Sequence, residues 1–207
     1  MPDADFHFYE PGKGHGLPHD PLNAIVAPRP IGWVSTVSPD GVRNLAPYSF
    51  FMLFNYRPPI IGFSSMGWKD SVANVQATGE FVWNLATRAQ AEAMNASSAS
   101  VAPEIDEFAL AGLDALPSTL VRPNRVAGSP VQFECRLTQL VRLETKEGAA
   151  LDQWLVLGEA IGVHIDRAML EDGIYQTARP HPILRGGGPA DYFEIGEDAL
   201  FKMPRPR

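Results

Sequence analysis

The fold is decided by the segments PRPIGWVSTVSPDG (residues 28–41), VRNLAPYSFFMLF (42–54), PPIIGFSSMGWKDS (58–71) and TGEFVWNLAT (78–87). The first three each carry an apolar run rich in β-branched or aromatic residues, which is typical of strands, and turn residues separate these runs. A Lys-Asp-Ser step at 69–71 precedes a short stretch with helical spacing. We therefore predict three strands, one short helix and a further strand within these sixty residues.

The boundaries of these elements follow from proline, glycine and capping residues. We predict strands over 31–37, 42–54 and 60–65, with a Pro-Asp-Gly turn at 39–41 in which Pro fixes φ and Gly accepts positive φ. Pro47 marks a break or a sheet edge, because Pro has no N–H for a ladder. The helix covers 71–77, where Asp70 is a good N-cap and Gly79 a good stop.

The rest of the chain continues the same pattern. We expect strands over 80–85, 131–143 and 154–165, a turn at 169–173, and helices over 88–96 and from Pro103 to Gly112. Strands and helices do not alternate cleanly, so a doubly wound parallel sheet does not fit. The predicted fold class is mainly β, an antiparallel barrel with a few short helices.

Composition supports one folded domain. The 207 residues are 45% hydrophobic, with 19 Pro and 18 Gly that favour turns. We divide them into an irregular N-terminal arm (1–21), a domain (22–196) and a polar C-terminal tail (197–207).

The net charge and the cysteine content indicate which kinds of protein this chain is not. The net charge of −7 provides no electrostatic footprint for nucleic acid, and no apolar run reaches the length of a membrane span. The single cysteine cannot form an internal disulfide, and no secretion signal precedes the domain, so we expect a cytoplasmic protein.

Polar residues gather around the Lys-Asp-Ser step. A helix start presents unpaired N–H groups and partial positive charge, so it can hold a phosphate together with an ammonium and hydroxyls. The candidates are Ser64, Ser65, Lys69, Asp70 and Ser71. On spacing alone, an ordinary helix cap with a solvated lysine is the better interpretation.

A second group of small polar residues lies among apolar ones: Ser35, Thr36, Asn44 and Ser49. A flavin ring needs such a mixture of flat apolar contacts and a few hydrogen-bonding groups. On these residues alone, ordinary strand-end and turn chemistry is the better interpretation.

Other chemistries are poorly supported. Cys135 lies in the middle of a predicted strand, which indicates a buried, inert thiol. There is no nucleophile elbow, no zinc-binding histidine spacing and no G-x-G-x-x-G motif; the glycines after Arg185 do not make a dinucleotide site.

The motifs together resemble the flavin reductase-like proteins with an FMN-binding split barrel, in particular the flavoredoxin-like branch and the small reductase components of two-component flavin monooxygenases. The resemblance spans roughly residues 22 to 196. It rests on PRPIGWVST (28–36), NLAPYSFF (44–51), KDS (69–71) with Asn74, TGEFVWNL (78–85), DEF (106–108), AGL (111–113), SPV (129–131), LGE (157–159), and RGG (185–187) before Tyr192.

The resemblance implies a homodimer with FMN near the subunit interface and NAD(P)H as co-substrate. Ser35 and Thr36 would lie along the isoalloxazine. Arg29 and Arg185 are candidates for stabilising the anionic reduced flavin, and no catalytic residue is assigned. The other implied cofactor-binding residues are Asn44, then Ala46, Pro47, Tyr48, Ser49 and Phe50 as the ring wall, and Ser64, Ser65, Lys69 and Ser71 at the phosphate, with Asp70 starting the helix.

Three functions remain open from the sequence. The first is an NAD(P)H-dependent FMN oxidoreductase, which would pass electrons to a flavin-dependent monooxygenase or another acceptor. The second is an FMN protein that only relays electrons. The third is a split-barrel binding module that has lost its flavin.

Overall fold

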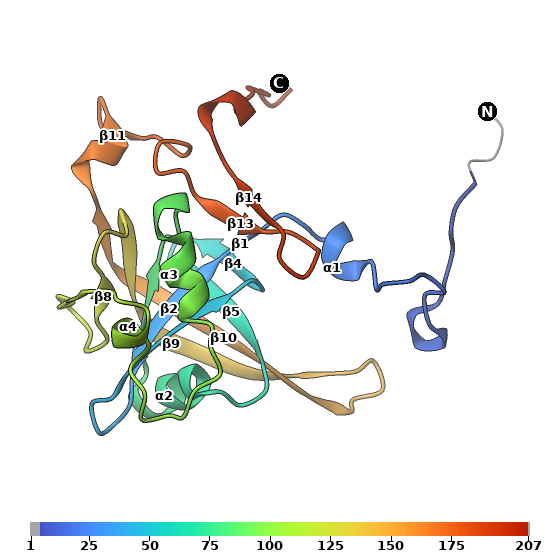
Figure 1. Ribbon diagram of the computed structural model, residues 1–207, viewed down its shortest axis with the longest axis horizontal. Coiled ribbons are helices and arrows are strands. Elements are labelled where there is room, and N and C mark those ends of the chain that lie inside the picture. Colours follow the sequence, from blue (N-terminus) through green and yellow to red (C-terminus); the bar gives the residue numbers. More distant parts are fainter. Residues whose placement is uncertain (1–4, 207) are drawn as a thin grey trace.

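The computed structural model describes residues 5–206. Its body is a seven-stranded antiparallel sheet in the order β3-β2-β6-β9-β10-β5-β4 (Figure 1). The strands are β2 (Gly32–Val37), β3 (Arg43–Tyr48), β4 (Phe51–Tyr56), β5 (Pro59–Met66), β6 (Glu80–Asn84), β9 (Val131–Glu144) and β10 (Ala150–Ile165). The sheet curls so that β3 meets β5, where the rings of Tyr48 and Phe63 lie 4.5 Å apart. The predicted antiparallel β class is confirmed.

The predicted strand over 42–54 is wrong, because the structure divides it into β3 and β4. β3 pairs with β2, and β4 pairs with β5 at the opposite edge of the sheet. Ser49 and Phe50 link the two strands, and the Phe50 carbonyl already accepts the Ser64 N–H at 2.8 Å. Pro47 lies in the edge strand β3, as its missing N–H requires.

Helix α2 (Asp70–Thr78) packs on the barrel through Val72 and Val75, which are fully buried. Gly79 ends it in the left-handed conformation (φ 71°), as predicted. The N-cap is Lys69 rather than Asp70, which is the first helical residue.

The helix predicted from Pro103 begins four residues later. Helix α4 (Glu107–Leu110) starts where the Asp106 side chain accepts the Phe108 N–H at 2.9 Å. The cap, not the proline, therefore sets the start. The region predicted as a helix over 88–96 is a 3₁₀ turn, η2 (Arg88–Gln90), followed by α3 (Ala91–Ala96).

The remaining elements are short. A three-stranded sheet has the order β1-β13-β14, and two small hairpins flank the barrel, one of which contains the predicted turn at 169–173. Their bounds are η1 (Pro11–Lys13), α1 (Leu22–Ile25), β1 (Arg29–Pro30), β7 (Ala115–Leu116), β8 (Arg125–Val126), η3 (Arg167–Met169), β11 (Leu170–Glu171), β12 (Ile174–Tyr175), β13 (Ile183–Arg185), β14 (Tyr192–Glu194) and η4 (Glu197–Ala199).

Two apolar clusters make the core. One fills the barrel around Phe63 and Phe81, and the other joins Trp33 to Met94 and Phe108 under α3 and α4. Cys135 belongs to the first cluster, and burial raises the pKa of its thiol far above the usual range. The thiol is therefore buried and inert, as predicted.

Residues 5–21 extend away from the barrel in Figure 1. No helix within residues 5–206 combines the length and the apolar character needed to cross a membrane. The division into arm, domain and tail stays a prediction.

Candidate functional site

A cavity of about 530 Å³ opens between β3, the end of β5 and the start of α2. Most of the predicted cofactor-binding residues line it, although they come from three separate segments. These residues are Asn44, Ala46, Pro47, Tyr48, Ser49, Phe50, Ser64, Lys69, Asp70 and Ser71. The cavity falls within the roughly 300–1,000 Å³ range of small-molecule sites.

One end of the cavity is suited to an anion. Lys69 caps α2 through its carbonyl, which accepts the N–H groups of Val72 (2.9 Å) and Ala73 (3.0 Å), and no side chain caps the helix. The N–H groups of Asp70 and Ser71 therefore have no intrahelical acceptor. No ion pair occupies the Lys69 ammonium within residues 5–206. An ammonium and free helix amides at one cavity wall match a phosphate group.

Behind this wall, a buried network fixes the polar groups. The Asn44 amide donates to Thr36 Oγ1 at 3.0 Å and to Ser71 Oγ at 2.9 Å. Asn74 Nδ2 also donates to Thr36 Oγ1, at 3.1 Å. Thr36 thus orients Asn44, and Asn44 orients the Ser71 hydroxyl at the helix start.

Tyr48 connects this network to the apolar wall. Burial raises the pKa of its phenol, although hydrogen bonds with Ser71 and Ser65 act in the opposite direction. The phenol therefore stays neutral at physiological pH and serves as a hydrogen-bonding group.

Three predicted residues are structural supports and do not line the cavity. Ser35 and Thr36 are almost completely buried in β2, and Ser65 in β5. Ser65 Oγ donates to the Gly67 carbonyl at 3.0 Å and holds the turn before Lys69. The expectation that Ser35 and Thr36 lie along the flavin ring does not fit this placement, because both hydroxyls are engaged within the chain.

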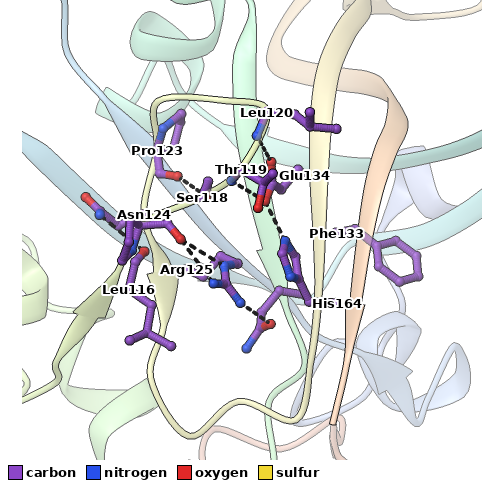
Figure 2. Close-up of polar contacts among 12 residues, drawn as sticks. Leu116, Ser118, Thr119, Leu120, Pro123, Asn124, Arg125, Phe133, Glu134 and His164 are labelled. Carbon is purple, nitrogen blue, oxygen red and sulfur yellow. Dashed lines mark hydrogen bonds and ion pairs between the residues drawn. The ribbon is translucent and has the colours of Figure 1, made fainter. Parts of the chain in front are cut away.

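Ser35 instead holds the loop between β7 and β8. Its hydroxyl donates to the Asn124 carbonyl, in the segment between β7 and β8. Figure 2 shows how the other side of this segment is held: Glu134 accepts the backbone N–H groups of Thr119 and Leu120 and contacts the His164 ring. Burial raises the pKa of Glu134, but these hydrogen bonds outweigh it and the net pKa is lowered.

Arg29 and Arg185 lie outside the cavity, on paired positions of β1 and β13. Arg29 donates to the carbonyls of Asn23 and Val26, and Arg185 to those of Pro189 and Asp191. The Arg29 guanidinium carbon lies 5.5 Å from the centre of the Phe50 ring, at the cavity rim. Both guanidiniums thus donate hydrogen bonds to backbone carbonyls outside the cavity.

The sequence did not reveal one part of the cavity lining. The segment 97–101, together with Pro103 and Glu107, also lines the cavity. The only signal was a cluster of serines after a short helix, which is also typical of a plain loop. Glu107 is 6% exposed, and its Oε2 accepts the Leu45 N–H at 3.0 Å.

The chain is similar to proteins of a known family. Residues 26–183 match the family model of the flavin reductase like domain. An uncharacterized protein of Aquifex aeolicus is 36% identical over 184 residues, which cover 85% of this chain and 89% of that protein.

Two solved structures share the fold. Nitrilotriacetate monooxygenase component B from Bacillus cereus has a TM-score of 0.81 at 28% identity, over 88% of this chain and 90% of that one. A protein from Shewanella frigidimarina NCIMB 400, described as a flavin reductase with a split barrel domain, has a TM-score of 0.77 at 19% identity, over 89% and 90%. The barrel is therefore a split barrel, and the chain belongs to the flavin reductase-like family.

Proposed function

We propose that the protein binds FMN in the cavity beside α2 and transfers a hydride from NAD(P)H to it. The observation that carries this proposal is the combination of Lys69 and free helix amides in a cavity that the apolar residues Ala46, Pro47 and Phe50 also line. A phosphate at the polar end would bring the isoalloxazine along residues 46–50. Membership of the flavin reductase-like family supports the choice of flavin.

The chain's contribution is binding and orientation. Bound FMN supplies the hydride chemistry itself. Lys69 and the first amides of α2 hold the phosphate, while Pro47 and Phe50 present flat apolar surface to the ring. The network of Thr36, Asn44 and Ser71 keeps the polar side chains in place before the ligand binds. Binding therefore costs little side-chain entropy.

A second copy of the chain completes the proposal. β4 is an edge strand whose apolar residues are unusually exposed: Met52 is 53%, Phe54 54% and Tyr56 72% accessible. Long exposed apolar edges favour association, so we infer a homodimer in which the partner covers β4. The similarity to a monooxygenase component B suggests a flavin-dependent monooxygenase as electron acceptor. A cytoplasmic location belongs to the same proposal.

The test is spectroscopic and kinetic. Purified protein titrated with FMN should show bound oxidised flavin, and NADH or NADPH oxidation should depend on added FMN. Flavin binding without turnover of either nicotinamide would favour an electron-relay protein. A colourless protein that ignores FMN would overturn the cofactor assignment.

A further inference from the structure

Glu107 is an acidic residue in the wall of a cavity that otherwise suits an anion. It is the first residue of α4, it is 6% exposed, and it lines the cavity together with Lys69 and Ser71. One carboxyl oxygen accepts the Leu45 N–H at 3.0 Å. Within residues 5–206, Leu45 is the one other residue that donates a hydrogen bond to this carboxyl, and the backbone N–H of Glu107 itself also acts on it.

No cation neutralises Glu107 within the described chain. Its neighbour Asp106 takes the Arg43 guanidinium, with Arg43 Nε at 2.8 Å. From α2, Asp70 faces Glu107 and adds a second negative charge, and Tyr48 on β3 is neutral. Among the described residues that line the cavity, Lys69 is the one cation.

These surroundings disfavour the carboxylate relative to that of an exposed glutamate. Burial raises the pKa of Glu107, and the charges of Asp70 and Asp106 raise it further, against the lowering effects of the backbone N–H groups of Leu45 and of Glu107 itself. A dianionic phosphate entering the same cavity adds charge of the same sign, which again disfavours the carboxylate.

We propose that Glu107 couples binding of the FMN phosphate to proton uptake by the protein. The inference rests on the proposed function, because it needs FMN in this cavity. The proton passes from solvent to the Glu107 carboxylate, and no other bond changes. The neutral acid keeps its carbonyl oxygen for the Leu45 N–H and no longer repels the phosphate. Glu107 thereby makes the affinity for phosphorylated flavin, but not for riboflavin, depend on pH.

The experiment is calorimetric titration of FMN and riboflavin into the full-length protein at pH 8. Two phosphate-free buffers with different heats of protonation report the protons taken up. We expect net uptake with FMN and none with riboflavin. The matched variant is Glu107→Gln, whose amide oxygen can still accept the Leu45 N–H. It should bind FMN without proton uptake and about three- to tenfold more tightly than the wild type at pH 8.

A pH series separates the protonation of Glu107 from the protonation of the FMN phosphate. The FMN phosphate has its own second ionisation near pH 6, but that affects both proteins equally. The affinity gap between Glu107→Gln and wild type should therefore close as the pH falls from 8 toward 6.

Several outcomes would overturn the inference. Equal proton uptake for FMN and riboflavin, or for wild type and variant, reduces Glu107 to a structural acceptor for Leu45. If the variant does not fold, the comparison of FMN with riboflavin in the wild type decides alone. If the wild type binds riboflavin and FMN equally or binds neither, the proposed phosphate site fails instead.

Discussion

Lys69 is an uncommon residue at a helix N-cap, because its side chain has no oxygen to accept the first helical N–H groups. The helix start is left uncapped by any side chain. Such a start costs stability unless another group satisfies the amides, and a bound anion is one such group. The residue thus places a positive charge where the helix already presents one, which makes sense for binding rather than for folding.

Replacing Lys69 by alanine should weaken FMN binding by about 1–3 kcal/mol, the scale of a hydrogen bond to a charged group. Riboflavin has no phosphate, so its affinity should change much less. Fluorescence titration of both flavins measures the difference. Lys146→Ala is a matched control, since Lys146 lies in the β9–β10 turn and pairs with Glu147. Equal losses for FMN and riboflavin would contradict the phosphate placement.

Glu134, unlike Lys69, is a fully buried charged residue whose charge is paired within the chain. It accepts the N–H groups of Thr119 and Leu120 and pairs with His164, and its pKa is lowered. A folded pKa below the unfolded one adds stability at pH above the ordinary glutamate value. That stability is lost as the pH falls through the lower, folded value.

Glu134→Gln should therefore lower the free energy of unfolding by about 1–3 kcal/mol at pH 7. The gap to the wild type should narrow in acid, once the wild-type carboxylate is protonated. Urea unfolding over a series from pH 7 down to about pH 3 measures how the gap changes as the carboxylate is protonated. Glu147→Gln, at an exposed position, should leave stability unchanged at pH 7. A gap that stays constant with pH would rule out the charge of Glu134 as the cause.

At the scale of elements, the position of the Phe81 ring on β6 depends on a missing side chain on β10, which lies beyond β9 in the sheet. A Cβ on Gly158 would lie 2.3 Å from Cε1 and 2.6 Å from Cζ of the buried Phe81 ring. The ring occupies the place that a side chain would need, so its present position requires glycine at residue 158.

Gly158→Ala should destabilise the barrel by about 1–3 kcal/mol through overpacking. Urea unfolding followed by tryptophan fluorescence measures the change. Gly12→Ala is the control, because a Cβ there meets no atom within 4 Å. A neutral Gly158→Ala would mean that the Phe81 ring moves aside at little cost.

Local pattern predicted the elements better than their connections. Hydrophobic periodicity and turn residues placed β2, β5, β6, β9, β10 and α2 within a few residues of their bounds. It did not separate β3 from β4, because Ser49 is the one polar residue in 45–54 and Pro47, the predicted break or edge position, lies inside β3. Only pairing with β2 on one side and β5 on the other divides that run, and such pairing is a tertiary effect.

The candidate site divides in the same way. Residues close in sequence, from Lys69 to Ser71, were found because a helix start has a local signature. The family resemblance implied that Ser35 and Thr36 lie along the flavin ring, and only the folded sheet shows that both side chains are buried. The wall formed by segment 97–101 comes from the chain after α3, and nothing in its composition separates it from an ordinary loop.

For the whole molecule, the distribution of apolar surface is the strongest indication of an assembly. Consecutive residues of β4 are about half exposed or more, although the neighbouring strand β5 is largely buried. The same strand directly follows Phe50, which lines the cavity. A partner that covers β4 would therefore also lie next to the flavin site, and dimer formation and flavin binding should be linked.

Met52→Glu places a charge on β4 without changing a buried residue, since Met52 is 53% exposed. It should weaken the proposed dimer about tenfold or more, because a charge at an interface core must lose its water. Sedimentation velocity over a concentration series measures the dimer, and circular dichroism checks the fold. Ile174→Glu is the matched control: Ile174 is 66% exposed in the separate β11–β12 hairpin. If both variants sediment as the wild type does, β4 is not the contact surface. If Met52→Glu yields folded monomers that also lose FMN affinity, the partner supplies part of the flavin site.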